Sequence, residues 1–328
     1  MFKESGLITY YSLTPVHVGA GSSVSYIDLP VQRERHTSFP MMAGSGLKGV
    51  FRALAERDDN FKNNVNLIFG PEDGSEGSSC AAFTDAKILL YPVRSVKNVF
   101  AWITCPCVLK RLKEDLEIAG LQVDNFTIPN LNNEDCKIIV LNGSKLKIDN
   151  NKVGLEEFVF DIDSSQNNNL ENLINEIKNY IPDTETAQNL KDRFAIVSDN
   201  VFTDLVNYAV EVRTRIRIDQ TTGTAQSGAL FTVEMVPSES IFYSLVFTDD
   251  PKNNNQNNND LKDANSVMEK IKKLIDNKVI QFGGDETIGL GFAKVKFTEI
   301  KTNQGDNKKQ SNWGNRNDRS WIPNCIKN

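Results

Sequence analysis

Residues 44–52 read Gly-Ser-Gly-Leu-Lys-Gly-Val-Phe-Arg and join a glycine-rich turn to the start of a cationic helix. Ser45 is a candidate N-cap, and the glycines on either side let a ligand approach the backbone. Lys48 and Arg52 lie four residues apart and therefore share one face of that helix. Free N–H groups and two cations at one helix end suit an anion, and the anion we expect is a phosphate.

Two other interpretations of this stretch need to be weighed. A nucleotide-binding P-loop has four residues between its first glycine and a Gly-Lys-Ser/Thr sequence, whereas Lys48 is followed by Gly49 and no hydroxyl is placed to hold magnesium. The segment therefore does not predict an NTPase. In the second interpretation, Gly46 and Gly49 allow close helix packing while both cations are simply solvated.

A second group of cations lies in a β-like segment between residues 208 and 236. Arg213, Arg215 and Arg217 occupy alternate positions, so a period of two places them on one face of a strand. A Thr/Gly/Ser/Ala-rich loop follows, and the pattern predicts a hairpin with a basic stripe. An edge strand protected by charge would have the same pattern.

The overall charge limits what these cations can do. The 328 residues carry a formal net charge of −6 with a pI near 5.2, which argues against a protein that coats nucleic acid indiscriminately. Any nucleic-acid site must therefore be local. Basic residues do cluster at five places: Arg33 and Arg35; Lys48, Arg52 and Arg57; Arg94 and Lys97; Lys110, Arg111 and Lys113; and Arg213, Arg215 and Arg217.

Length, cysteines and hydropathy bound the class of protein. The length fits two domains, or one domain with large insertions. Five cysteines at these spacings match neither a disulfide framework nor a zinc site, so we expect reduced thiols. The N-terminus has no apolar signal core, and no apolar run is long enough to span a membrane. We expect a cytoplasmic protein that has no membrane partner.

Hydrophobic periodicity and turn residues predict the elements that position these groups. Strands are expected at 7–13, 82–93, 99–104, 136–141, 155–162, 241–248 and 291–297, and helices from Pro106 to Gly120, at 170–180 and at 261–275. Polar runs at 167–169 and 252–260 predict exposed loops. The four glycines between Phe282 and Phe292 imply backbone conformations closed to other residues, or close approach by another chain.

Several short segments occur in a fixed order across nearly the whole chain. They are Thr14–Gly21, Ile27–Glu34, Gly44–Gly49, Phe69–Glu72, Phe83–Lys87, Pro92–Ser95 with Phe100–Pro106, and Gly283–Gly291. Together they resemble the RAMP superfamily of CRISPR proteins, and most closely the repeating backbone subunit of the type III-B (Cmr) RNA-guided effector complex. Each glycine motif alone is unspecific, whereas the ordered set is hard to obtain otherwise.

The resemblance implies an α+β fold: a ferredoxin-like (RRM-like) RAMP palm with an inserted region and a long β-hairpin thumb. One domain would span residues 1–328, with the inserted region at about 120–195 and the thumb at about 208–237. The implied partners are CRISPR guide RNA, target RNA, other Cmr subunits and other copies of the chain. The copies would stack head to tail in a helical filament, with each thumb interrupting the guide–target duplex.

The resemblance also implies which residues contact RNA. A filament that grips RNA by sugar and phosphate needs helix N-termini, lysines and arginines, while base pairing with the guide provides specificity. Lys48 and Arg52 would contact guide phosphates. The full set of expected RNA-binding residues is Ser45, Lys48, Arg52, Arg33, Arg35, Arg215, Arg217, Gly284 and Gly289.

The implied activity is metal-dependent cleavage of the bound target RNA, with Asp28 as the matching carboxylate. Asp28 would bind a divalent cation, Mg²⁺ or Mn²⁺, or help to position the target 2′-hydroxyl for in-line attack on the adjacent phosphate. That attack leaves a 2′,3′-cyclic phosphate and a 5′-hydroxyl. Without the resemblance, Asp28 would be interpreted as an Asx-type loop cap.

Other polar residues have competing interpretations. Glu34 is the other group near Asp28 that could take or position a proton, and Glu234 is either a helper from a neighbouring subunit or a solvated strand charge. His17 is expected to be structural and His36 an exposed loop residue. Asp285 and Glu286 are interpreted as loop structure. Cys105 and Cys107 are expected to be buried thiols.

Three functional hypotheses remain. The first is a guide-binding backbone subunit that is also an endoribonuclease toward the paired target. The second is a non-catalytic scaffold that binds guide RNA while a partner subunit cuts. The third is a phosphate-binding metabolic enzyme, which predicts a nucleic-acid-free monomer.

Overall fold

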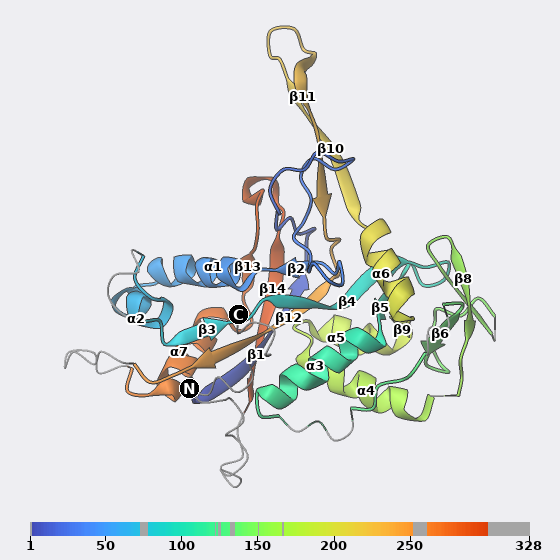
Figure 1. Cartoon of the computed structure of the whole chain (residues 1–328), viewed down its shortest axis with the longest axis horizontal. Helices are drawn as coiled ribbons and strands as arrows, with labels where there is room; N and C mark the ends of the chain where they lie inside the picture. The colour runs from blue at the N-terminus through green and yellow to red at the C-terminus, as the bar shows by residue number, and fades with distance from the viewer. Residues whose placement is uncertain are drawn as a thin grey trace, which may run out of the picture.

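The computed structural model of the chain describes residues 2–72, 78–121, 123, 126–131, 135–149, 151–165, 167–251 and 261–300. These residues form one large mixed sheet flanked by helices, and a separate two-stranded hairpin that projects from the body (Figure 1). The chain is therefore mixed α and β, as expected. None of the helices in this described part combines the length and the apolar composition needed to cross a membrane.

The sheet strands run in the order β13-β14-β1-β12-β4-β5-β9-β6-β8-β7, with β2 paired to β4 and β3 paired to β12. Their bounds are β1 Glu4–Ser12, β2 Met41–Met42, β3 Ala81–Phe83, β4 Ala86–Arg94, β5 Phe100–Thr104, β6 Lys137–Val140, β7 Lys152–Leu155, β8 Phe158–Ile162, β9 Phe194–Ile196, β12 Ile241–Thr248, β13 Val279–Gln281 and β14 Phe292–Ile300. The hairpin consists of β10 Glu211–Ile218 and β11 Ala225–Met235.

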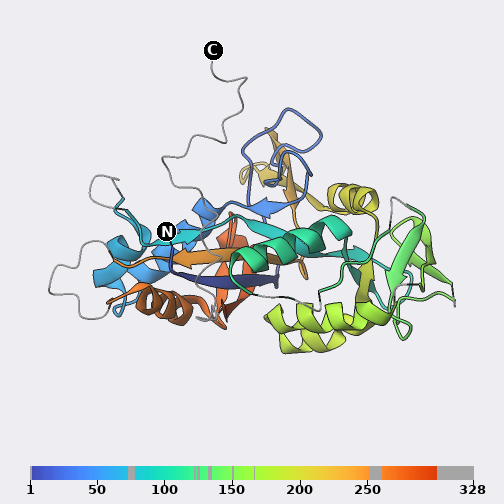
Figure 2. The ribbon, with the colours of Figure 1, turned by 60° about the horizontal axis from the view of Figure 1, so that its bottom comes forward.

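The helices are α1 Gly44–Glu56, α2 Val65–Phe69, α3 Pro106–Ile118, α4 Asn167–Tyr180, α5 Thr184–Arg193, α6 Asp199–Tyr208 and α7 Ala264–Ile275, with 3₁₀ turns η1 Lys62–Asn64 and η2 Glu286–Ile288. In the turned view, α7 and the α4–α5 pair lie along one side of the sheet (Figure 2). Helix α7 begins with a capping box at Asp263 and contacts β1, β12 and β14.

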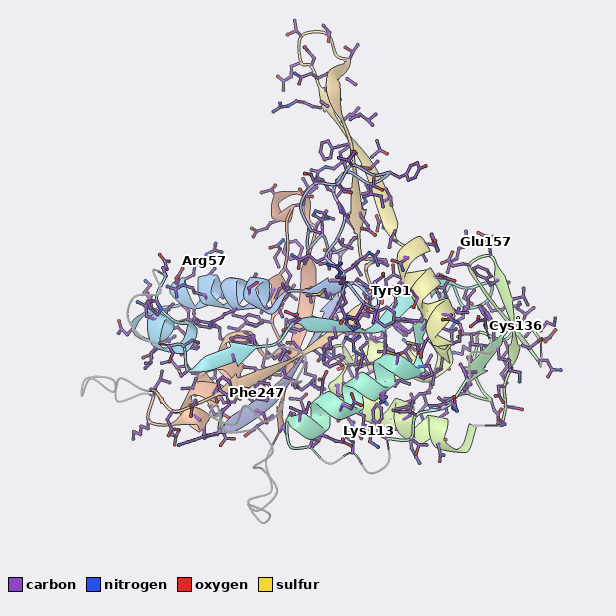
Figure 3. All side chains as sticks on the ribbon, viewed as in Figure 1. Arg57, Tyr91, Lys113, Cys136, Glu157 and Phe247 are labelled. Atoms are coloured by element: carbon purple, nitrogen blue, oxygen red, sulfur yellow. The ribbon has the colours of Figure 1, made fainter. Side chains whose placement is uncertain are left out.

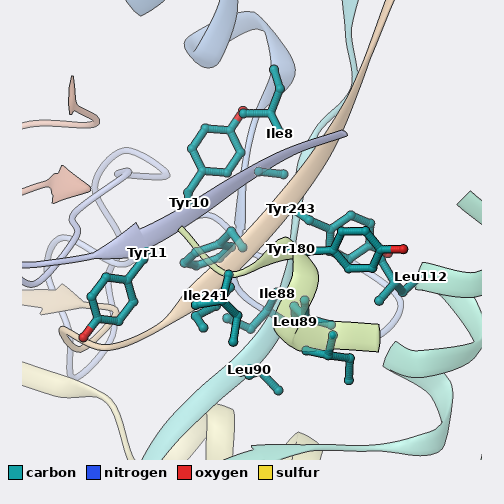
Figure 4. Close-up of a cluster of buried hydrophobic side chains, with 14 of the residues drawn as sticks. Ile8, Tyr10, Tyr11, Ile88, Leu89, Leu90, Leu112, Tyr180, Ile241 and Tyr243 are labelled. Atoms are coloured by element: carbon teal, nitrogen blue, oxygen red, sulfur yellow. The ribbon is translucent and has the colours of Figure 1, made fainter. Parts of the chain in front are cut away.

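Strand β1 lies at the centre of the core. It pairs antiparallel with β12 on one side and β14 on the other, and both of its faces are buried. Figure 4 shows buried side chains from β1, β4 and β12 in one cluster with Leu112 of α3 and Tyr180 of α4, and the side chains of β1 point to both sides of the strand. The buried Tyr10 hydroxyl is satisfied by Ser244 Oγ at 2.8 Å, and Thr9 Oγ1 donates to the Tyr180 carbonyl at 2.5 Å. This core fixes the frame on which the loops described below rest.

The predicted strand at 99–104 and the helix that follows it from Pro106 are confirmed. Pro106 occupies the first turn of α3, where its missing N–H costs nothing, and Gly120 follows the helix with a φ of 93°. The apolar positions that repeat at helical spacing are buried: Val108, Leu109, Leu112 and Leu116.

Four details differ from the predictions. The expected strand at 82–93 is two strands, because the chain breaks at Thr84–Asp85. The expected strand at 155–162 is the end of β7 and all of β8, joined by a turn in which Glu156 has a φ of 49°. Residues 167–169 start α4 and are not a loop. Helices α2, α5 and α6 and strands β2, β9 and β13 were not predicted, and the polar run 252–260 lies outside the described residues.

The hairpin is confirmed as a separate feature. Strand β10 pairs with β11 and is not an edge strand of the large sheet in the described part of the chain. A small apolar cluster at its base is separate from the main core and contains Val233, Met235 and Leu290, with Leu29 and Phe231 packed against it. Figure 3 shows that side chains cover the projecting hairpin along its length. The hairpin is therefore anchored by its own cluster at the base and is solvated beyond it.

Candidate nucleic-acid interface

The N-terminal end of α1 presents free backbone donors. Ala43 is the N-cap and makes no side-chain capping bond, so the expectation that Ser45 caps the helix is wrong; Ser45 lies in the first turn and is exposed. The Gly44 N–H donates to Asp85 Oδ1 at 2.7 Å. The next two amides, of Ser45 and Gly46, have no hydrogen-bond partner among the described residues and point from a positive helix end.

One face of α1 is open beyond these amides. Ser45, Lys48, Gly49 and Arg52 lie at i, i+3, i+4 and i+7 and so share a face opposite the buried Leu47 and Phe51. A side-chain carbon added at Gly46 or Gly49 would meet no atom within 4 Å. Close helix packing therefore does not explain these glycines in the described chain. Gly44 is different, because the same carbon there would lie 2.6 Å from the Phe83 carbonyl oxygen.

Lys48 is the free cation of this face. Its side chain is half-buried, and it has no ion-pair or hydrogen-bond partner among the described residues. Burial lowers the pKa of Lys48 below its ordinary value and outweighs an opposing effect of Cys80, and the neighbouring Arg52 cation adds a smaller effect in the same direction as burial. A cation held partly out of water without a partner gains from binding an anion, which restores the lost solvation.

Arg52 has an internal role. Its guanidinium donates to Glu56 Oε1 at 2.8 Å, to Asn66 Oδ1 at 3.0 Å and to the Gly70 carbonyl. These contacts fasten α1 to α2, and they leave Arg52 less able to bind a guide phosphate than its spacing suggested. Arg52 therefore fits a structural role better than the expected RNA contact, and Lys48 remains as the cation of the pair.

Asp28 lies against the base of the hairpin. Its Oδ2 accepts hydrogen bonds from the Thr232 backbone N–H at 2.7 Å and from Thr232 Oγ1 at 2.9 Å. The backbone bond, followed by the hydroxyl bond, holds the pKa of Asp28 below its usual range. The carboxylate is therefore ionised at neutral pH, and no other described residue donates to its second oxygen, Oδ1. The role of Thr232 as the partner of Asp28 was not predicted, and no motif near Thr232 in the sequence indicates it.

The segment that carries Asp28 runs beside β11 like a short parallel strand. The Leu29 N–H donates to the Thr232 carbonyl at 3.0 Å, and the Glu234 N–H donates to the Leu29 carbonyl at 3.0 Å. Asp28 is therefore positioned by the hairpin and not by a free loop. The Asx-cap interpretation is wrong, because such a cap binds a backbone N–H of its own loop, whereas the donor to Asp28 lies more than 200 residues away in the chain.

Arg33 and Glu234 form a buried ion pair, which corrects two expectations. Arg33 Nη2 lies 2.5 Å from Glu234 Oε1, with side-chain exposures of 18% and 5%. Arg33 Nη1 also donates to the carbonyls of Ser38 and Val206. Glu234 is therefore neither a solvated strand charge nor open to a neighbouring subunit, and Arg33 fits an internal role better than the expected RNA contact.

Glu34 is anchored inside the chain, whereas the two residues after it are exposed. Arg35 and His36 are exposed, and Arg35 has no partner among the described residues, so it remains a candidate for RNA binding. Glu34 accepts two hydrogen bonds from Arg111 on α3, at 2.5 and 2.9 Å, and one from Thr37 at 2.5 Å. Glu34 is thus committed to an internal ion pair and cannot assist Asp28.

Glu34 supports a prediction about acid stability. Burial raises its pKa, but the bonds from Arg111 and Thr37 outweigh burial and hold the pKa below the ordinary value of 4.5. A depressed pKa contributes stability that is present above the ordinary value and is lost as pH falls through the folded value. We therefore expect the free energy of unfolding of Glu34→Gln, measured by urea titration, to fall less than that of the parent when the pH is lowered from about 6 to about 3.

Glu114→Gln is the matched control for that experiment. Glu114 forms an exposed ion pair with Lys110 on the same helix as Arg111, at 3.9 Å. Such a pair contributes little, so this variant should follow the parent across the acid range. A Glu34→Gln curve parallel to the parent would show that the Glu34–Arg111 pair has no part in acid unfolding.

The glycine-rich loop at residues 283–291 packs against the backbone of His17. Gly283, Gly289 and Gly291 have φ values of 82°, 84° and 81°, which confirms that this segment uses conformations that other residues rarely adopt. A side-chain carbon at Gly283 would lie 2.3 Å from the His17 carbonyl oxygen, and the Gly284 N–H donates to that oxygen at 2.9 Å. Gly284 thus has an internal contact, while Gly289 has open space around it.

His17 has the structural role that was expected. Its ring is buried, and Nδ1 lies 2.7 Å from the Glu234 carbonyl oxygen. Cys105 is a buried thiol as expected, whereas Cys107 is only half-buried.

The basic stripe of the hairpin is partly neutralised. Arg215 Nη1 donates to Asp285 Oδ2 at 2.8 Å, and Arg213 pairs with Glu211 at 2.5 Å. Asp285 therefore ties the glycine-rich loop to the hairpin, a specific role within the loop structure that was expected. Arg217 is exposed without a partner among the described residues, and the pairing register shifts next to it, between Ile216 and Ile218. Exposed apolar residues accompany these cations: Val212, Ile216, Ile218 and Leu230.

A resident metal does not fit this site. The described residues contain no group of three His, Cys, Asp or Glu side chains placed to hold a metal ion. One oxygen of Asp28 is already bonded to Thr232, so this chain would offer a cation a single free carboxylate oxygen. Mg²⁺ and Mn²⁺ require several more oxygen ligands, which would have to come from RNA phosphates and water.

Comparisons with known proteins identify relatives across nearly the whole chain. The sequence pattern of the RAMP superfamily matches residues 9–294. The CRISPR system Cmr endoribonuclease Cmr4 of Pyrococcus furiosus is 40% identical over 309 residues, which cover 92% of this chain and 99% of that protein. The CRISPR system CMR subunit Cmr4 of Saccharolobus solfataricus is 24% identical over 321 residues, covering 89% and 98%.

Solved structures show the same fold. The crystal structure of oligomeric Cmr4 from Pyrococcus furiosus superposes with a TM-score of 0.71 at 33% identity, covering 91% of this chain and 99% of that one. A chain in the cryo-EM structure of the type III-B Cmr-β complex bound to cognate target RNA superposes with a TM-score of 0.67 at 21% identity, covering 90% and 98%. At that identity the second likeness concerns the fold alone.

Proposed function

Because this chain belongs to the RAMP superfamily, we propose that it is the repeating backbone subunit of a type III-B CRISPR complex, and that it binds guide RNA and cleaves the paired target RNA. Its partners are other copies of itself, other Cmr subunits, guide RNA and target RNA. The 40% identity to a Cmr endoribonuclease over nearly the whole of both chains supports the activity.

The open face of α1 is the main structural support for the proposed binding of guide RNA. Two unpaired amides at a helix N-terminus, the Ser45 hydroxyl and the unpartnered Lys48 converge beside glycines that leave the backbone uncovered. A phosphodiester backbone is negatively charged and narrow enough to approach the uncovered amides of this face. No base-reading side chain is needed, because pairing between guide and target provides the sequence specificity.

The finer description of the fold is part of this proposal. Strands β14, β1, β12 and β4 are neighbours in that order, and α1 follows β1 while α7 follows β12. This matches the β-α-β-β-α-β arrangement of a ferredoxin-like palm. The segment at about 120–195, which includes β6 to β8 and α4 to α5, is the inserted region, and the hairpin within about 208–237 is the thumb.

Asp28 acts on the target strand in this proposal. Its pKa lies low, so Asp28 is a weak base, and its better role is to accept a hydrogen bond at the free Oδ1 and orient the target 2′-hydroxyl toward the adjacent phosphate. A divalent cation, brought with RNA phosphates and water, would supply charge neutralisation at that phosphate. Attack by the 2′-oxygen gives a 2′,3′-cyclic phosphate and a 5′-hydroxyl.

The non-catalytic scaffold is the second candidate. The observation that favours it is the pair of hydrogen bonds from Thr232, which gives Asp28 a structural role without any chemistry. In that case the open face of α1 would still bind guide RNA, and the cuts would come from a partner subunit.

Native purification tests the proposal. We expect a tagged chain expressed in its own host to purify with RNA of defined length and with copies of itself, and its 260/280 nm absorbance ratio to exceed that of protein alone. A nucleic-acid-free monomer would contradict the proposal and would favour a phosphate-binding metabolic enzyme. The products of added target RNA, analysed for cyclic phosphate ends, then separate the catalytic subunit from the scaffold.

A further inference from the structure

We propose that Glu234 and Arg33 are a positioning pair that sets the location of Asp28 for target cleavage. This inference depends on the proposed function. Glu234 is 3% exposed, although it belongs to a projecting hairpin, and a carboxylate so deeply buried requires compensating partners.

Three of the four polar groups of Glu234 bind residues that closely follow Asp28, and the fourth binds His17. The side-chain Oε2 accepts the Val31 N–H at 2.9 Å, and Oε1 accepts Arg33 Nη2 at 2.5 Å. The Glu234 N–H donates to the Leu29 carbonyl at 3.0 Å, and the Glu234 carbonyl oxygen lies 2.7 Å from His17 Nδ1. One residue of β11 is therefore bonded to three residues that closely follow Asp28, and also to His17.

This fastening determines where the Asp28 carboxylate lies. Thr232, two residues before Glu234 on β11, makes the direct contacts with Asp28, and Leu29 bridges Val233 between them. The register between the two segments is fixed at residues 29 and 31 by backbone and carboxylate bonds. If those bonds loosen, Asp28 can shift relative to Thr232 and to the RNA on the hairpin.

Glutamine is the informative replacement for Glu234. It has the same shape, but one of its two terminal atoms is a donor. Val31 and Arg33 both donate, so one of the two hydrogen bonds cannot form whichever way the amide is turned. Because catalytic positioning is sensitive to displacements of about 1 Å, we expect a roughly tenfold to hundredfold slower cleavage step. The Glu234 side chain is buried and bonded within the chain, so it has no direct contact with RNA in this proposal, and the affinities for guide and target should stay within about twofold of the parent.

The experiment uses the assembled complex with guide RNA. Single-turnover cleavage at saturating target gives the rate of the chemical step, and target titration gives the affinity. Glu234→Gln and Arg33→Met should both slow the step, and Arg33→Lys, which keeps the charge, should restore part of the rate. Glu211→Gln is the matched control, since it breaks the exposed Glu211–Arg213 pair on the same hairpin and should leave the rate unchanged.

The possible outcomes separate this inference from the proposed function. A parental cleavage rate in a folded Glu234→Gln complex overturns the positioning role, as does a loss that appears only in target affinity. If Glu234→Gln does not assemble, the ratio of the Arg33→Lys rate to the Arg33→Met rate decides, and equal rates overturn the role. Asp28→Ala is measured in parallel, and unchanged cutting by that variant contradicts the proposed function itself.

Discussion

Asp28→Ala in the assembled complex is expected to abolish the regularly spaced cuts in target RNA, by about two to four orders of magnitude in rate, while guide RNA stays bound. The carboxylate is ionised, and Thr232 holds one of its oxygens while the other is open. Alanine removes the group that orients the 2′-hydroxyl. It leaves α1, where we place the guide, untouched.

The control for Asp28 is a carboxylate with the same local chemistry elsewhere. Asp163 accepts the Ser165 N–H at 2.9 Å and the Ser165 hydroxyl at 2.6 Å, as Asp28 accepts both donors of Thr232. Asp163→Ala removes an equivalent anchor outside the site, and the complex with this variant should cut normally. The cut products are measured by denaturing gel with end analysis. Undiminished cutting by the Asp28→Ala complex would leave only the scaffold function.

Lys48→Ala is expected to weaken guide RNA binding by about tenfold to a hundredfold, the value of a charge-assisted hydrogen bond to phosphate. The lysine is half-buried without a partner, so it gains more from a phosphate than a solvated surface lysine does. The slope of log K against log salt should also become less negative by about 0.7 for each phosphate that the protein no longer neutralises. Fluorescence anisotropy with labelled single-stranded RNA measures both quantities.

Two further variants make the Lys48 result specific. Lys62→Ala removes a lysine of an exposed ion pair with Asp59 near α2 and should change neither affinity nor slope. Gly49→Leu places a side chain on the open face, where nothing lies within 4 Å of the added carbon. It should stabilise the free chain by up to about 1 kcal/mol through helix propensity while it weakens RNA binding. Stabilisation with RNA affinity unchanged would place the guide elsewhere.

The elements with strong local signals were predictable from the sequence. Strand β12 matches its predicted bounds, and α3 starts at Pro106 and ends before Gly120 as expected. Helix α6 was missed because its sequence, with Val and Phe beside Asn and Asp, has weak helix propensity. Its start depends on a Ser198 side chain that caps the Val201 N–H. The break at Thr84–Asp85 depends on Asp85, which binds Gly44 on another element.

The sequence identified the candidate residues of the site by their types, but it did not reveal which residues each of them contacts. Spacing identified Lys48 and Arg52 as equivalent cations, yet Asn66 of α2, the Gly70 carbonyl and Glu56 of α1 accept hydrogen bonds from Arg52, and no described residue accepts one from Lys48. Spacing likewise could not reveal that Arg33 pairs with Glu234 across 201 positions of sequence. Long-range contacts of this kind decide which charges are free for a ligand. Periodicity along the chain contains no information about them.

The central claim is that guide RNA lies along the N-terminal face of α1. A structure of the assembled complex with its guide tests this most directly. We expect a guide phosphate within hydrogen-bond distance, about 3 Å, of the Ser45 or Gly46 N–H, with Lys48 Nζ beside the same backbone. An assembly in which this end of α1 faces solvent or another protein, with the guide on a different surface, would contradict the claim.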